Sequence, residues 1–440
     1  MLGSGPSEDT PPPEDGRSAR SGRELLVRSP YGAYFFGKLL WATGVWVFTV
    51  TTAILMYSLT ESAFLVGVAS FSQYLPLLVL SPSSGARADR RDPQRQAAFS
   101  RALMAVGSTV LAVQLLLGDA ATDTTVIVLL IAAVTFGTGD AIGAPAAQAL
   151  VPTLVRPAEL PTAIELDAIP FTLARALGPL LGAAIAAAIS SAYAYLYSAL
   201  VCLAFAALLV HLRPERPRPM RDRVPGEGSV LAGLRYLRTQ PRLVVLLLGV
   251  TAVGFGVDPV VTLTPALVAV LGGEPASVAA MASAFGTGAG VMLLALRAVR
   301  KRIGVHRVAP LGLGVLGLTM LLLTVVPDVT AAIAVVGVGG AGYAMAITSL
   351  TTMLQSDVDD AMRGRVMAFW SVTYFGSRPI AAAVHGSVAE LVSVRAALLV
   401  TTTLILTGAI VVARRRGSVA VARSASNDVP EAPAPSPMSA

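Results

Sequence analysis

Twelve long apolar segments recur along the 440-residue chain, and turn residues or charges separate them. Each is close to the ~20 residues that a helix needs to cross a bilayer. Charged residues make up 13% of the chain, whereas soluble domains carry about 25%. These features exclude a soluble enzyme, a secreted disulfide scaffold and a disordered chain. The expected spans are Phe35–Tyr57, Ala63–Leu80, Ala97–Leu117, Thr125–Ala149, Leu160–Ile189, Ala192–Leu212, Leu243–Leu271, Ser277–Leu296, Val308–Val326, Thr330–Leu354, Val366–Val388 and Ala396–Val412.

The basic residues indicate which side of the membrane each loop faces. With a cytoplasmic N-terminus, the two tails, alternate loops and adjoining helix ends hold 30 of the 33 Lys and Arg residues. The other three are Arg175 and Arg378, inside spans, and Arg395, in the last outer loop. Because cytoplasmic loops are enriched in Lys and Arg, we expect a multi-pass cell-membrane protein, in a bacterial inner membrane, with both termini cytoplasmic.

The proline- and arginine-rich segment after the sixth span divides the chain into two sets of six spans. Its second part, LAGLRYLRTQPRL, predicts an amphipathic helix on the membrane surface. Pro179 and Pro379 lie mid-span at a separation of 200 residues, which favours a duplicated all-α membrane protein with two pseudo-symmetric six-helix bundles. The expected parts are a disordered cytoplasmic tail at 1–30, bundles at 31–212 and 243–413, a cytoplasmic linker at 213–242 and a disordered tail at 414–440.

The segment that follows the second span, GARADRRDPQR, is the most specific short motif. Its glycine allows a tight turn and its acid can pair with an arginine, so the loop can act as a latch between two states. The alternative is an ordinary basic loop. The cytoplasmic gate that we predict from this motif and from the loop before the eleventh span comprises Gly85, Asp89, Arg90, Asp92, Arg363 and Arg365.

This motif resembles the signature between the second and third helices of the major facilitator superfamily, G-x-L-A-D-R-x-G-R-K. Gly85, Asp89 and Arg90 match it, as does Ala88, whereas Arg87 replaces its leucine. Asp92 and Pro93 stand where Gly and Arg are usual. The amino-acid sequence of residues 154–182, 233–243 and 351–376 is similar to that of the drug:proton antiporter branch, which includes the enterobactin exporter and macrolide-efflux proteins. The resemblance covers about residues 31–413 and implies the major facilitator fold.

Charges inside the bilayer are costly and are therefore functional candidates. Asp140, Arg175, Asp258 and Arg378 lie within spans, and we consider all four as candidates for proton coupling. Asp140 and Arg175 occupy consecutive spans and are the easier pair to form, although such a pair can also be purely structural. Asp258 has no neutralising neighbour in sequence. His385 titrates near neutrality, but a lone histidine in a helix is usually structural.

Gly178, Pro179 and Gly182 place two small residues four apart around a proline in the fifth span. Such spacing allows close helix packing, and the group also resembles the Gly-Pro motif of superfamily exporters, with Ala183 in place of a glycine. Aromatic and polar side chains near the expected midplane are candidates for a substrate cavity. These are Trp41, Trp46, Gln73, Tyr74, Gln148, Tyr343 and Trp370.

The resemblance implies a secondary transporter that exports a small organic molecule (a drug, siderophore or secondary metabolite) in exchange for protons, by rocking one bundle against the other. The alternatives are an importer, an uncoupled facilitator or a membrane sensor. The chain shows no P-loop, no His/Cys metal spacing and no catalytic motif, so we expect no enzyme activity, no cofactor and no metal. We also expect a monomer in the lipid bilayer with no nucleic-acid partner.

Overall fold

The computed structural model describes residues 20–90, 92–118, 121–215 and 230–414, and every regular element in these ranges is a helix. The first half begins with one short helix, α1 (Gly22–Arg28), and includes two 3₁₀ turns, η1 (Val151–Thr153) and η2 (Pro157–Glu159). Its helices are α1 (Gly22–Arg28), α2 (Pro30–Thr60), α3 (Ala63–Arg90), α4 (Pro93–Leu117), α5 (Thr122–Leu150), α6 (Leu160–Asp167), α7 (Ile169–Ala188) and α8 (Ser191–His211).

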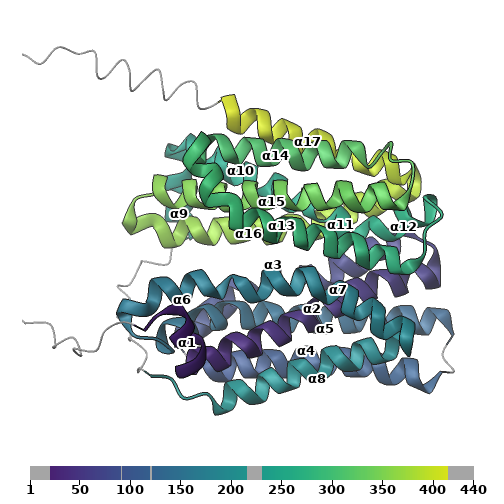
Figure 1. Cartoon of the computed structure of the whole chain (residues 1–440), viewed down its shortest axis with the longest axis horizontal. Helices are drawn as coiled ribbons and strands as arrows, with labels where there is room; N and C mark the ends of the chain where they lie inside the picture. Colours follow the sequence, from purple (N-terminus) through teal and green to yellow (C-terminus); the bar gives the residue numbers. More distant parts are fainter. Residues whose placement is uncertain (1–19, 91, 119–120, 216–229, 415–440) are drawn as a thin grey trace, which may run out of the picture.

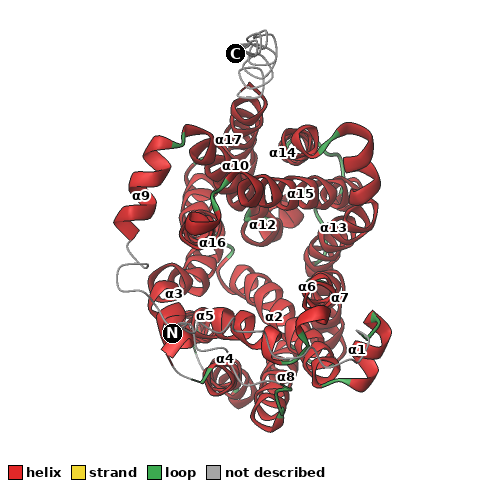
Figure 2. Ribbon diagram, turned by 90° about the vertical axis from the view of Figure 1, so that its left-hand side faces the viewer, coloured by secondary structure: helices red, strands yellow, loops and turns green. Residues whose placement is uncertain are grey.

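The second half begins after a linker helix, α9 (Val230–Thr239). Figures 1 and 2 show the two halves as separate bundles of long helices, with α3 beside α16 and α7 beside α13 where the bundles meet. The helices of the second half are α10 (Pro241–Val257), α11 (Pro259–Thr262), α12 (Thr264–Val270), α13 (Pro275–Ile303), α14 (Val305–Leu322), α15 (Val329–Asp357), α16 (Asp360–Leu391) and α17 (Val394–Arg414).

The helix lengths confirm an all-α membrane protein. Eleven helical segments among the described residues are long and apolar enough to cross a bilayer. The remaining expected span is the eleventh, Val366–Val388, which corresponds to α16; this helix has 32 residues but is less apolar because it carries charged and polar side chains along its length. Six spanning segments precede α9 and six follow it.

Proline and charge break two spans that the sequence presents as continuous. The fifth span divides into α6 and α7 at Ala168, before Pro170. The seventh divides at Asp258 and again at Leu263, before Pro259 and Pro265 respectively. Proline cannot donate a backbone hydrogen bond and displaces the preceding residue from ideal helical geometry. The break at Asp258 is important because it places a carboxylate at an interruption in the helix.

The bundles touch each other from the middle of the spans to the end away from the chain termini. A Cβ at Gly67 of α3 would lie 2.6 Å from the Ala382 carbonyl oxygen, and one at Gly286 of α13 would lie 2.6 Å from the backbone of Arg175. Such distances are sterically excluded, so these glycines allow the close approach of the two halves. At the far end, the Ser62 hydroxyl donates to Glu390 Oε2 over 3.0 Å.

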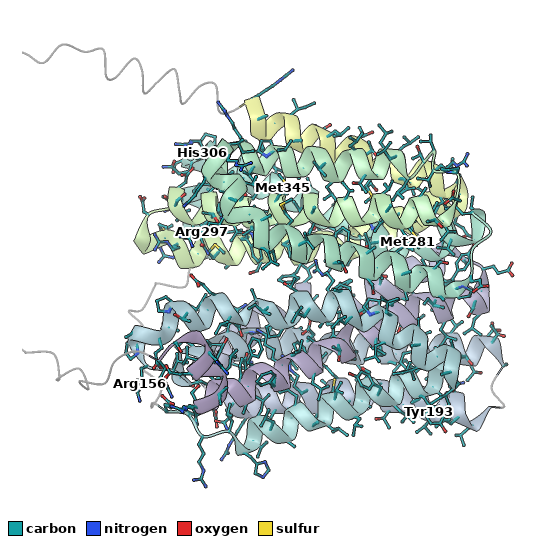
Figure 3. The ribbon with its side chains drawn as sticks, in the orientation of Figure 1. Arg156, Tyr193, Met281, Arg297, His306 and Met345 are labelled. Carbon is teal, nitrogen blue, oxygen red and sulfur yellow. The ribbon has the colours of Figure 1, made fainter. Side chains whose placement is uncertain are left out.

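The opposite end carries the basic loops and both described ends of the chain (Figure 3). Arg156, Arg297 and His306 lie at this end, and Tyr193 lies at the other. Here the Arg20 side chain forms ion pairs of 2.8 Å with Glu159 and with Glu215. Hydrogen bonds to the carboxylates, that of Glu159 above all, raise the pKa of the Arg20 guanidinium above its ordinary value.

Two helices outside the spans, α1 and α9, bear on the sequence-based predictions for the N-terminal tail and the linker. Residues 22–28 form α1, although the sequence predicts a disordered tail; Ser21 and Glu24 cap the helix reciprocally, and Leu25 is fully buried. The predicted linker helix is present as α9. It packs on α16 and α10, and the Tyr236 hydroxyl donates to Asp359 Oδ2 over 3.0 Å.

Candidate functional site

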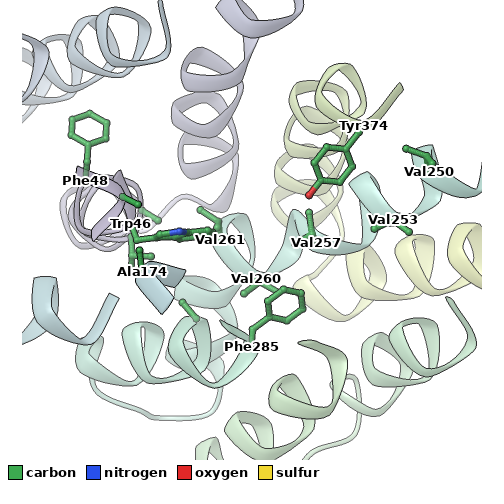
Figure 4. Packing of buried hydrophobic residues seen from close by; sticks show 14 of the residues in the cluster. Trp46, Phe48, Ala174, Val250, Val253, Val257, Val260, Val261, Phe285 and Tyr374 are labelled. Carbon is green, nitrogen blue, oxygen red and sulfur yellow. The ribbon is translucent and has the colours of Figure 1, made fainter. Parts of the chain in front are cut away.

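Aromatic rings and two arginines from both halves meet close to the midpoints of their helices. We name this group the central cluster: Trp46, Tyr74, Arg175, Phe285, Tyr343, Tyr374 and Arg378. The first three come from α2, α3 and α7, and the others come from α13, α15 and α16. Figure 4 shows Trp46 facing Val261 of the second half, with Phe285 and Tyr374 nearby. Substrate sites of transporters with this two-bundle plan lie at this depth.

Arg175 of the first half lies against rings of the second half. Its guanidinium carbon is 4.8 Å from the ring centre of Tyr343 and 6.0 Å from that of Phe285. It is also 5.0 Å from Trp46 within its own half. A guanidinium over an aromatic face gains cation–π attraction. The side chain is 7% exposed, so these contacts replace most of its water.

Arg378 makes the reciprocal contact. Its guanidinium carbon, on α16 of the second half, lies 4.3 Å from the ring centre of Tyr74 in the first half. One turn earlier on α16, the Tyr374 hydroxyl lies 2.8 Å from the Tyr343 hydroxyl, and the Tyr374 ring stacks on Trp370. Each half therefore extends one arginine onto an aromatic ring of the other half.

Asp258 and His385 form a buried pair of titratable side chains within the spans. His385 Nδ1 lies 2.7 Å from Asp258 Oδ2, and the two side chains are 0% and 1% exposed. The other ring nitrogen, Nε2, lies 2.7 Å from the Thr401 hydroxyl. One proton occupies the Nδ1–Oδ2 hydrogen bond, on either atom, because two bare acceptors would repel each other. The sequence-based view that His385 is a lone histidine is therefore wrong.

Asp258 also connects to the first half. The Thr262 hydroxyl lies 3.1 Å from Asp258 Oδ1 and 3.3 Å from the Ser70 hydroxyl on α3. Ser70, Thr262, Asp258, His385 and Thr401 thus form a continuous hydrogen-bonded chain between α3 and α17. Asp258 is therefore joined through one side chain, Thr262, to a contact between the two halves.

Asp140 does not pair with Arg175, contrary to the sequence-based pairing. Its Oδ1 lies 3.6 Å from Nη1 of Arg101 on α4, and the guanidinium carbon of Arg101 lies 3.7 Å from the ring centre of Trp41. Arg101 was expected among the cytoplasmic helix ends, but it is 1% exposed. Because α4 and α5 are the tightly packed neighbours here, the acid on α5 meets the cation on α4 first.

The seven residues proposed for a cavity fall into three environments. Trp46 and Tyr74 of the first half, with Tyr343 and Trp370 of the second, lie in or against the central cluster. The other three do not. Trp41 stacks on Phe205 inside the first half, Gln73 donates to the Thr49 hydroxyl, and Gln148 is exposed near the end of α5.

The gate motif begins inside a helix. Residues Gly85 to Arg90 form the last turns of α3 instead of a loop. The surroundings of Gly85 and the side chains of Asp89 and Arg90 lie outside the described part of the structure. Asp92 caps α4 by accepting from the backbone N–H groups of Gln94 and Arg95. In α16, Arg363 is exposed, and Arg365 is half-buried with Nη1 2.9 Å from Met362 Sδ.

The fifth-span motif packs α7 on α2. A Cβ at Gly178 would lie 2.7 Å from Trp46 Cβ, and one at Gly182 would lie 3.3 Å from Val47 Cα. Pro179 is accommodated inside α7 without ending it. The motif therefore holds Trp46 and Arg175 on adjoining helices of the first half.

Sequence reasoning missed Arg101, Phe285 and Tyr374. Arg101 lies eight residues into α4, where a long side chain is easily assigned to the helix end. Tyr374 had a usable signal, because Trp370, Tyr374 and Arg378 follow one another at four-residue spacing on one face of α16. Phe285 carries no signal of its own, since its role depends on the approach of α13 to α7.

Helices of this number and order, with charges at the meeting of the halves, define a membrane transporter of the major facilitator type. The model of the transmembrane secretion effector family matches residues 30–438, and the chain belongs to this family. No curated protein matches significantly in sequence.

Solved structures confirm the fold at low sequence identity. A variant of the nucleoside transporter NupG superposes with a TM-score of 0.71 at 13% identity, covering 87% of this chain and 98% of that one. A bacterial homologue of the human lysosomal transporter Spinster, inward-facing and occupied, gives 0.70 at 14%, covering 88% and 96%. A bacterial homologue of the iron transporter ferroportin, inward-facing, gives 0.69 at 13%, covering 88% and 98%.

Proposed function

We propose that this transporter exports a small organic molecule in exchange for protons, and that the Asp258–His385 pair carries the proton. The observation that supports this assignment is the burial of a carboxylate and an imidazole, 2.7 Å apart, at the break between α10 and α11. A hydrogen-bonded carboxylate and imidazole can hold one proton between them. The pair is therefore our candidate for the group that carries the proton.

The hydrogen-bonded chain from Asp258 through Thr262 to Ser70 supplies the coupling to conformation. When Asp258 gains or loses a proton, its Oδ1 changes as an acceptor for Thr262, and the contact of Thr262 with the first half changes with it. Rocking of the bundles exposes the midplane to each side in turn. The proton thus biases which of the two arrangements is stable.

The outward direction rests on the fifth-helix motif. Gly178, Pro179 and Gly182 resemble the motif of superfamily exporters, and they pack α7 tightly on α2 beside the central cluster. We also propose that both termini are cytoplasmic, which the basic loops at one end of the bundle support, and that the protein lies in a bacterial inner membrane. We further propose a monomer, because each half completes the site of the other within one chain.

Metabolite profiles of cells and medium test the direction of transport, with the gene intact and deleted. We expect one organic compound to accumulate inside the deletion strain and to fall in its medium. That compound, added to everted vesicles with an acidic lumen, is expected to release protons from the lumen. Accumulation in the medium of the deletion strain would instead indicate an importer.

A further inference from the structure

The two arginines of the central cluster have no charge partner among the described side chains. The described carboxylates that form ion pairs within the spanning segments or at their ends are Asp140, Glu159, Asp167, Asp258 and Asp357, and these pair with Arg101, Arg20, Lys38, His385 and Arg242 respectively. Each of these acids already has a partner, and the partner of Asp258 is a cation only when His385 is protonated. Arg175 and Arg378 are therefore two guanidinium groups without an ion-pair partner among the described residues, and both lie at the meeting of the halves, each less than 10% exposed.

An uncompensated buried cation is expensive because burial removes its hydration. Cation–π contacts with Tyr343 and Tyr74 recover part of it. They leave hydrogen-bond donors unused, because Nε of Arg175 and Nε of Arg378 are both buried without a partner in the described structure. A planar guanidinium with free donors binds carboxylates and similar anions better than any other class of group.

The surroundings of these donors indicate the rest of the ligand. Phe285, Trp46, Tyr74 and Tyr343 present ring faces to the same two guanidinium groups. Flat aromatic ligands stack on such rings, while an anionic substituent meets the arginines. A cationic ligand would replace cation–π attraction by repulsion from two fixed charges.

We propose that the substrate is an aromatic organic anion, and that Arg175 and Arg378 bind its acidic group. The anion site is inferred from side-chain chemistry alone, whereas the role of the bound anion as the transported substrate rests on the proposed function. When the anion binds, it draws Arg175 away from Tyr343 and Arg378 away from Tyr74. Both of these contacts join the two halves, so the substrate loosens the arrangement seen here. In an inside-negative cell, the membrane potential also drives an anion outward.

Binding of three ligands that differ in charge alone tests the proposal. The probes are 2-naphthoate, 2-naphthamide and 2-naphthamidine, which carry a negative, zero and positive charge on the same ring system. Isothermal titration of the purified full chain in nanodiscs measures their dissociation constants. We expect naphthoate to bind about 10- to 100-fold more tightly than the amide, as for hydrogen bonds to charged groups, and the amidine to bind most weakly.

Variants assign the effect to the two arginines. Arg175→Gln and Arg378→Gln are each expected to reduce the preference for naphthoate over naphthamide by about 10-fold, whereas Arg175→Lys and Arg378→Lys retain part of it. Arg300→Gln is the matched control. Arg300 is half-buried, and its Nε has no hydrogen-bond partner in the described structure. Its Nη2 donates to the Ser349 hydroxyl, away from the central cluster, so its loss should leave the preference unchanged.

Equal binding of the three probes, tighter binding of the amidine, or no binding of naphthoate overturns the proposal. So does a naphthoate preference that survives both glutamine variants. Proton release from everted vesicles separates the anion site from the transport mechanism. The vesicles have an acidic lumen, and valinomycin with K⁺ removes the membrane potential. Proton release on addition of naphthoate supports both proposals. Naphthoate binding without proton release contradicts proton exchange and leaves the anion site standing.

Discussion

Asp140 and Asp258 are both carboxylates inside spans, but the structure gives them different partners. Asp140 pairs with Arg101, which belongs to the same half, and its side chain is 37% exposed. Asp258 pairs with His385, is 1% exposed, and reaches Ser70 of the other half through Thr262. One acid is therefore held within a bundle, and the other lies in a chain of contacts between bundles.

The difference in partner decides what each acid can do. A guanidinium keeps its proton at any physiological pH, so Arg101 attracts the charged form of Asp140 but does not itself exchange a proton. An imidazole can accept or give up a proton, so the Asp258–His385 pair can hold a proton between its two members. Position within a span is thus the same for the acid that we propose for coupling and for the one that we propose to be structural, whereas their partners differ.

Replacement of Asp258 should have the largest effect. Asp258→Asn keeps the size and one acceptor for Thr262 but removes the group that binds the proton. We expect substrate-dependent proton release from everted vesicles to fall by about 100-fold or more, as for the loss of other positioned proton-transfer groups.

Substrate binding to Asp258→Asn, measured by isothermal titration, should remain, which separates lost coupling from misfolding. Proton release at the wild-type rate would remove the distinction between the two acids.

Loss of the imidazole should have a smaller effect on rate and a characteristic effect on pH dependence. In His385→Gln the carboxylate that carries the proton is still present, so we expect transport to fall by about 10-fold. The variant also removes the ring nitrogen that shares a hydrogen bond with Asp258, so the pH profile of transport should differ from that of the natural chain. An unchanged pH profile would show that His385 only positions Asp258.

Replacement of Asp140 should affect stability more than transport. Asp140→Asn leaves the Arg101 charge without its carboxylate, although the stacking on Trp41 remains. Because the acid is partly exposed, we expect a loss of about 1–2 kcal/mol in the free energy of unfolding. The measurement is the thermal unfolding midpoint in detergent, together with the pH dependence of transport, which should match that of the natural chain.

Arg95→Ala provides the exposed counterpart to this variant. Its guanidinium lies 3.4 Å from Asp92, but the two side chains are 90% and 50% exposed. Water already screens this pair, so no measurable change in the unfolding midpoint is expected. A midpoint for Asp140→Asn equal to that of Arg95→Ala would show that the Asp140–Arg101 pair contributes nothing to stability.

The spans could be predicted from the sequence because the bilayer imposes a simple requirement on each helix separately. About 20 apolar residues satisfy it, and neighbours along the chain suffice to recognise them. The prediction was less accurate where local and long-range effects compete. Gly85 to Arg90 continue α3 beyond its apolar part, and Pro259 and Pro265 interrupt a span whose composition alone indicates one helix.

Partners across the bundle could not be predicted in the same way. The sequence by itself identified Asp140, Arg175, Asp258 and Arg378 as costly charges, because that cost depends only on their position within an apolar run. Their pairing depends on which helices approach and at what depth, and Asp258 meets His385, 127 residues away, only because α16 packs on α10 and α11. The chain sequence thus determined which charges need a partner, while the tertiary structure decided which partner each receives and which two receive none.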